Sequence, residues 1–222
     1  MITNLVTGKA FEAVSAQLDG RFVSPLDFER VGFKFSGEEL LGLSETLPSR
    51  EKLTELFKGR VTLVCGPNKP MTVSQIIKGV PSCFDPNAVD WCCVEESGDE
   101  KTQEPFRKDL ANPGWFAIRQ GLIPRSTGLS ADQGIALLGG DEMVPNVAEA
   151  AWVFMALKMA IRGDYVLNNI SGRTSSKSVD GSEIFIGRMV RGYFIGRCKS
   201  SDEILGLGTL SLIRVGGTQL LV

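Results

Sequence analysis

The most apolar stretch of the chain runs from Val144 to Gly163, and it predicts a buried helix. Ala150 to Leu157 contains no polar residue, so the helix must be covered on most of its sides. Pro145 suits a helix start, and Asn146 and Glu149 have the spacing of a capping box. We expect this helix to pack against a sheet formed by the C-terminal third of the chain.

That third of the chain consists of short apolar and β-branched runs separated by glycines, a pattern typical of strands. Asp180-Gly181 and Arg191-Gly192 supply turns that let neighbouring strands pair as hairpins. The predicted strands are Tyr165–Leu167, Ile184–Met189, Tyr193–Cys198 and Leu210–Val215.

The N-terminal half gives a clear pattern only between residues 49 and 78. Ser49–Lys58 predicts a helix that ends at Gly59, Arg60–Cys65 a buried strand, and Thr72–Lys78 a second short helix. In the first fifty residues only Val31–Phe35 alternates, and it predicts a strand.

The middle of the chain begins with a long polar segment from Pro81 to Asn112, which is acidic at its centre. A loop of this length is unusual inside a compact domain, so we interpret it as an insertion. Trp115–Arg119 predicts a strand. Ser130 and Gln133 have capping-box spacing at the start of a short helix that reaches about Leu138.

Composition limits the environment and the partners of the chain. With 222 residues, of which 43% are hydrophobic, it can bury a sizeable core, and the net charge of −2 does not favour nucleic acid. Lys9, Glu12 and Asp19 interrupt any signal-peptide pattern, and the central helix is too short to span a bilayer. Five cysteines, including the adjacent pair Cys92-Cys93, suggest reduced thiols in a cytoplasmic protein.

The sequence contains no histidine, which limits the available chemistry. Ser/His/Asp triads, Cys/His dyads and histidine-ligated zinc sites are impossible without a second chain. We therefore expect no metal, no cofactor and no catalytic residue.

Asp141 and Glu142 provide the alternative, a metal-dependent enzyme acting on nucleotides or phosphates. Gly139-Gly140-Asp141-Glu142 resembles the signature tetrapeptide of diguanylate cyclases, but it leads directly into a helix rather than back into a strand. Ser171–Ser178 resembles a phosphate-binding loop through Lys177-Ser178, although serines replace both required glycines. Solvated loop charges are the simpler interpretation of the two carboxylates.

A family resemblance covers about residues 115–222. It is carried by Gly172–Ser176, Glu183–Gly187, Tyr193–Ile195, Leu205–Gly208 and Leu212–Val215. Together these segments resemble the closing half of a C-type-lectin-fold domain. The nearest resemblance is to the calcium-independent branch, which includes formylglycine-generating-enzyme-like domains and the variable proteins of diversity-generating retroelements.

The resemblance implies an α+β fold, in which a C-type-lectin-like mixed sheet with a buried central helix follows a small α/β region. The implied domains are residues 1–112, with the acidic insertion, and residues 113–222. The calcium-binding tripeptides of sugar-binding lectins and the cysteines of the formylglycine-generating enzymes have no counterpart here. Calcium-dependent carbohydrate binding and that oxidase activity are therefore not implied.

In the variable proteins, the ligand face lies on the hairpin strands and the loop before the last strand. By position, the resemblance implies a ligand-binding set of Arg188, Arg191, Tyr193, Arg197, Lys199, Ser200, Ser201, Asp202 and Glu203. Strand alternation places Tyr193, Ile195 and Arg197 on one side.

The function implied is a non-enzymatic module that binds a protein or another macromolecular ligand, in the manner of a retroelement-diversified variable protein. A solvated sheet face without a ligand and a component of a phage or other structural assembly stay open as alternatives. The sequence indicates no oligomeric state.

Overall fold

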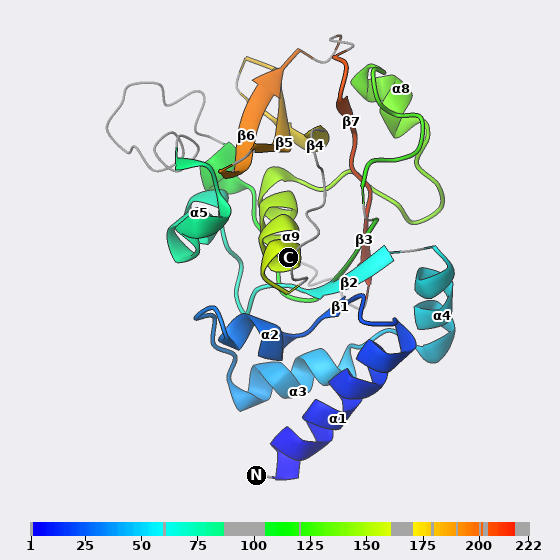
Figure 1. Cartoon of the computed structure of the whole chain (residues 1–222), viewed down its shortest axis with the longest axis vertical. Helices are drawn as coiled ribbons and strands as arrows, with labels where there is room; N and C mark the ends of the chain where they lie inside the picture. Colours follow the sequence, from blue (N-terminus) through cyan, green and yellow to red (C-terminus); the bar gives the residue numbers. More distant parts are fainter. Residues whose placement is uncertain are drawn as a thin grey trace.

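The computed structural model describes residues 2–59, 61–86, 105–119, 121–160, 171–178, 180–189, 191–199, 201 and 204–215. These residues form an α+β fold, as predicted, in which helix α9 (Val147–Ala160) lies between two four-stranded mixed sheets (Figure 1).

The first sheet has the order β1-β2-β3-β8. Its strands are β1 (Phe22–Val23), β2 (Val61–Cys65), β3 (Trp115–Arg119) and β8 (Leu212–Val215). β1 is parallel to β2, and the other pairs are antiparallel, with Trp115 opposite Val215. This sheet and a single hydrophobic core join both predicted domains, so the division at residue 112 does not separate two cores.

The second sheet has the order β6-β5-β4-β7. Its strands are β4 (Ser171–Lys177), β5 (Glu183–Met189), β6 (Gly192–Cys198) and β7 (Leu207–Thr209). β4 and β7 are parallel, and the hairpin turns fall at the predicted dipeptides. The segment 123–128 closes the outer edge of β7, because the N–H groups of Ile123 and Gly128 donate to the Thr209 and Leu207 carbonyls at 2.9 and 3.0 Å.

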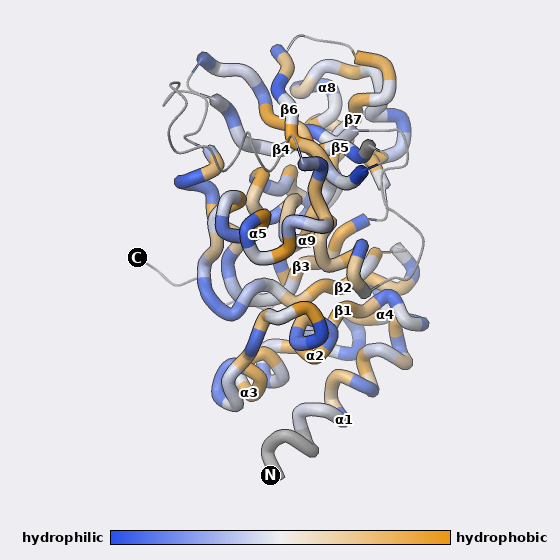
Figure 2. Tube along the Cα trace, turned by 60° about the vertical axis from the view of Figure 1, so that its left-hand side comes forward, coloured by the Kyte–Doolittle hydropathy of each residue, from blue (hydrophilic) through white to orange (hydrophobic). Residues whose placement is uncertain are grey.

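Helix α9 confirms the prediction of a helix covered on most sides. Every residue from Val147 to Leu157 is buried. Asn146 caps the helix, because its Oδ1 accepts the Glu149 N–H at 2.9 Å and the Glu149 carboxylate accepts the Asn146 N–H at 3.0 Å. Figure 2 shows apolar residues concentrated along α9 and along the strands that face it. Helix α9 thus forms the centre of the core.

The other helices of the described chain surround the two sheets and α9. They are α1 (Ile2–Gln17), α2 (Pro25–Glu29), α3 (Gly37–Glu45), α4 (Arg50–Lys58), α5 (Val73–Gly79), the 3-10 turn η1 (Pro81–Cys83) and α8 (Ala131–Ile135). Of these, α5 packs against α9 itself. The predicted cap Ser130 accepts a backbone N–H at the start of α8, and Ser49 and Thr72 cap α4 and α5 in the same way. In the described chain, no helix has the length and apolarity that a bilayer crossing requires.

One predicted strand is wrong. Val31–Phe35 forms turns and irregular backbone, in which Phe33 packs edge-on against Trp152 with ring centroids 5.0 Å apart. The predicted strand Tyr165–Leu167 and most of the acidic insertion lie outside the described residues.

Candidate functional site

The β5–β6 hairpin, which carries most of the predicted site, has two different faces. Its register pairs Glu183 with Cys198 and Met189 with Gly192, so side chains on each face can be assigned by alternation. The inner face carries Ile184, Ile186, Arg188, Tyr193, Ile195 and Arg197, and its apolar members are buried toward α9. The outer face carries Phe185, Gly187, Phe194 and Gly196.

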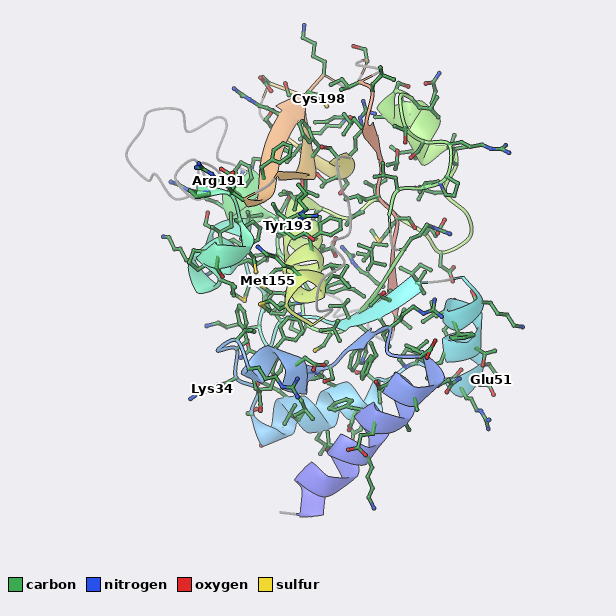
Figure 3. All side chains as sticks on the ribbon, viewed as in Figure 1. Lys34, Glu51, Met155, Arg191, Tyr193 and Cys198 are labelled. Carbon is green, nitrogen blue, oxygen red and sulfur yellow. The ribbon has the colours of Figure 1, made fainter. Side chains whose placement is uncertain are left out.

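Tyr193 is not a surface residue, contrary to the prediction. Its side chain is 0% exposed, and its ring centroid lies 5.4 Å from that of Phe154 on α9 and 6.5 Å from that of Phe84. Figure 3 shows Tyr193 beside α9, while Arg191 lies further out at the hairpin turn. Tyr193 and Ile195 do share a side with Arg197, as predicted, but this side faces the core for most of its length.

The predicted cations divide between the two ends of the hairpin. Arg188 is half-buried and Arg191 exposed near the turn, whereas Arg197 and Lys199 are exposed at the opposite end. Arg197 lies four residues after Tyr193 along the strand, a distance of about 13 Å. The structure therefore does not gather the predicted residues into one cluster.

Among the described residues, Arg197 forms a weak ion pair with Asp180. Its Nη1 lies 3.8 Å from the Asp180 Oδ2, and the two side chains are 43% and 59% exposed. Exposed pairs of this kind contribute little to stability, so the guanidinium can take another acceptor. Ser201 is exposed nearby in sequence, and Ser200, Asp202 and Glu203 lie outside the described residues.

The outer face holds an aromatic pair that the sequence analysis missed. The rings of Phe185 and Phe194 are half-buried, with centroids 5.9 Å apart at 88°. Each ring covers a glycine on the other strand. A Cβ added at Gly187 would lie 2.6 Å from the Phe194 ring, and one at Gly196 would lie 2.5 Å from the Phe185 ring. Alternation from Tyr193 would have placed Phe194 on the opposite face.

Asp141 and Glu142, the residues of the alternative enzyme hypothesis, do not converge. The Arg119 Nη2 donates to Glu142 at 2.6 Å, while the Lys52 Nζ lies 3.6 Å from Asp141. Burial alone would raise the pKa of Glu142, but hydrogen bonds from Arg119 and the Gly139 N–H outweigh it and lower that pKa. In the part of the chain that the structure describes, no three His, Cys, Asp or Glu side chains are grouped to hold a metal ion.

A pocket of about 300 Å³ is lined by residues of α3 and of the turns beside β2 and β3. Helix α3 lies on the other side of the first sheet from the β5–β6 hairpin (Figure 1). The lining of the pocket consists of Glu39, Gly42, Leu43, Thr46, Pro67, Asn68, Pro113 and Gly114. Its one carboxylate, on Glu39, already accepts the Ser36 N–H at 2.6 Å as part of a helix cap. The pocket therefore offers little specific polar chemistry to a ligand.

A scan against protein-family models found no match, and searches of curated proteins and of solved structures found none either. The resemblance to the C-type-lectin fold stays a prediction. The candidate site rests on the geometry of the β5–β6 hairpin, with the exposed cations Arg197 and Lys199 at the end away from the turn and the aromatic pair on the outer face.

Proposed function

We propose that the chain is a non-enzymatic binding module, which recognises a protein or another macromolecule through the β5–β6 hairpin. The observation that carries this proposal is the position of Arg197 and Lys199. Both cations are exposed on or beside a strand whose inner face is fixed by burial of Tyr193 and Ile195. A rigid strand can therefore present them without losing much conformational freedom on binding.

The outer face of the same hairpin, opposite to that of Arg197, adds apolar area. Phe185 and Phe194 are held by their contacts with Gly196 and Gly187, yet both rings keep exposed area. Aromatic rings supply most of the energy at many protein interfaces, and guanidinium groups add charge-assisted hydrogen bonds. The revised recognition set is Phe185, Phe194, Arg197 and Lys199.

The C-type-lectin-like scaffold and the diversification by a retroelement belong to this proposal. A reverse-transcriptase gene and an inexact template repeat beside the gene would support diversification. If neither is found beside the gene, the proposed binding function stands, but diversification by a retroelement is rejected.

The decisive experiment compares the wild-type chain with the double variant Arg197→Ala/Lys199→Ala. Partners are first identified by pull-down with the wild-type chain, then purified and titrated against both proteins. We expect the variant to bind at least about tenfold more weakly, equivalent to about 1.4 kcal/mol. Its stability should stay within about 0.5 kcal/mol of wild type, because both side chains are exposed.

The matched control is Lys58→Ala/Lys69→Ala, which removes two exposed cations outside the C-terminal sheet. This control should keep full affinity. Full affinity in the Arg197/Lys199 variant would refute the assigned surface. Strong stabilisation of the wild-type chain by manganese and a nucleotide, lost in Asp141→Ala, would favour the enzyme alternative instead.

A further inference from the structure

The two edges of the second sheet are closed to different extents. The outer edge of β7 is covered by segment 123–128. At the opposite edge, β6 is the outermost strand (Figure 1). Phe84 forms a parallel bridge to Tyr193, and the Asp85 N–H donates to the Tyr193 carbonyl at 2.7 Å. Among the residues that the structure describes, this short contact covers the beginning of the β6 edge.

The alternation of the antiparallel β5–β6 ladder shows which backbone N–H and C=O groups of β6 point outward along the rest of this edge. Residues of an antiparallel strand point their N–H and C=O groups alternately toward and away from the neighbouring strand. The Tyr193 carbonyl points away from β5, so the backbone groups of Ile195 and Arg197 also point away from it. Within the described residues, no segment outside the sheet hydrogen-bonds to the backbone of either residue.

The side chains along this edge select the chemistry of an added strand. Arg197 lies on the inner face, and Lys199 is exposed just beyond the end of the strand. Phe194 lies half-buried on the outer face. A strand beside β6 would therefore meet positive charge on one of its faces and an apolar ring on the other.

We propose that β6 accepts an extended acidic peptide segment of a partner protein as an additional strand of the sheet. This inference rests on the proposed function and names its partner class. The peptide backbone would exchange hydrogen bonds with the N–H and C=O groups of Ile195 and Arg197. Its acidic side chains would pair with Arg197 and Lys199, and its alternate apolar side chains would contact Phe194.

The pairing of Phe84 and Asp85 shows that the edge geometry suits an added backbone. Gly192 permits this approach, because a Cβ there would lie 2.6 Å from the Phe84 carbonyl carbon. A partner strand would continue the edge where Phe84 and Asp85 leave it. Natural proteins also place cations on edge strands to prevent pairing, and the experiment must separate that role from recognition.

The test uses the full chain and three synthetic peptides with blocked ends. The first peptide alternates Glu and Val over six residues, the second alternates Lys and Val, and the third is the Glu/Val peptide with its central Val replaced by Pro. NMR measures amide hydrogen exchange at Ile195 and Arg197, and fluorescence anisotropy measures affinity. We expect the Glu/Val peptide to slow exchange at both amides at least tenfold, whereas the Lys/Val and Pro peptides leave it unchanged.

A charge-reversed chain, Arg197→Glu/Lys199→Glu, should prefer the Lys/Val peptide, with its fold checked by circular dichroism. The wild-type comparison of the Glu/Val and Lys/Val peptides stands even if this variant does not fold.

The proposal is overturned if no peptide protects the two amides. That result would mean that the cations prevent strand pairing at this edge. It is also overturned if both amides are already protected without peptide and become exchangeable when residues 88–103 are replaced by a Gly/Ser linker. Peptide binding without protection at Ile195 and Arg197 would reject strand addition while leaving the proposed binding function intact.

Discussion

Glu149 and Arg214 join the buried helix to the edge of the first sheet. The Arg214 Nε donates to the Glu149 Oε1 at 2.7 Å, and the Nη2 of the same guanidinium lies 2.6 Å from that oxygen. The Glu149 side chain is fully buried at the start of α9, whereas Arg214 on β8 is 52% exposed. The same carboxylate caps α9 through the Asn146 N–H, so one acidic side chain fixes both the helix start and the position of β8.

Removing Arg214 should therefore destabilise the fold. In Arg214→Ala the buried carboxylate loses its charged donors, and we expect the free energy of unfolding to fall by about 1–3 kcal/mol. Urea denaturation measures this change. Arg197→Ala is the control, because its ion pair is exposed, and it should be neutral within about 0.5 kcal/mol. Equal stability of the two variants would show that the Glu149–Arg214 pair does not hold β8.

Trp152 and Phe154 test the central position of α9. The Trp152 ring stacks on Phe28 with centroids 4.7 Å apart, and its Nε1 donates to the Cys65 carbonyl at 2.7 Å. Trp152→Ala and Phe154→Ala should each lower the free energy of unfolding by about 3–5 kcal/mol. Leu205→Ala, at a side chain that is 93% exposed, should be nearly neutral in the same denaturation assay. A neutral Trp152→Ala would contradict the packing of α9.

Asp180 in the β4–β5 turn should titrate unusually low. Hydrogen bonds from the Ser178 hydroxyl and from the Ser182 backbone and side chain lower its pKa from 3.8 to about 2, and Arg197 is a minor cause. The lowered pKa means that this carboxylate stabilises the folded turn above about pH 4, and that the contribution is lost as pH falls toward 2. Carboxyl NMR titration should show a clear rise of this pKa in Ser178→Ala and only a small rise in Arg197→Ala. A larger rise in the second variant would identify charge, rather than hydrogen bonding, as the cause.

Gly192 should be far less replaceable than Gly181. Both have positive φ, +153° and +80°, but the Cβ of an alanine at Gly192 would lie within 3 Å of the Phe84 and Asp85 backbone, whereas Gly181 faces open space. Gly181→Ala should cost about 1 kcal/mol through backbone strain alone. Gly192→Ala should cost more and should also break the contact of Asp85 with β6. Amide exchange at Asp85 distinguishes the two variants, and unchanged protection in Gly192→Ala would contradict this prediction.

The sequence predicted those elements whose signals are local. Ser49, Thr72, Ser130 and Asn146 mark helix starts through their own side chains, and the β-branched run of β2 is a strand in any context. Helix α3 has an equally local signal in its Ser36/Glu39 capping box, but the surrounding glycines obscured it and no helix was predicted there.

Other elements depend on distant partners. In the sequence of helix α1, Gly8 and several polar residues break the apolar pattern, although the helix itself is continuous. The helix buries Phe11 and Val14 against other parts of the core. Val31–Phe35 alternates like a strand, but its phenylalanines pack around Phe28 and Trp152 instead of joining a ladder.

The candidate site shows the same limit. Strand alternation correctly placed Tyr193 and Arg197 on the same side of the hairpin, but alternation alone does not show which side is buried. The packing of Phe154 on α9 against Tyr193 decides which side is buried, and this contact joins residues far apart in the chain. On β6, the aromatic residue that keeps some exposure is therefore Phe194 rather than Tyr193.

The strand order has a consequence for biosynthesis. Helix α9 is synthesised before β4 and β5, which later cover it, and β3 must wait for β8 before the first sheet is complete. During translation the apolar stretch Ala150–Leu157 emerges after α5, β1 and β2 but before β4 and β5, so the side that these strands cover stays exposed at first. Exposed apolar segments of this type favour aggregation and are bound by chaperones. Pairing between strands so far apart also slows the search for the native topology. We therefore expect the chain to complete its fold slowly and only after β8 has left the ribosome.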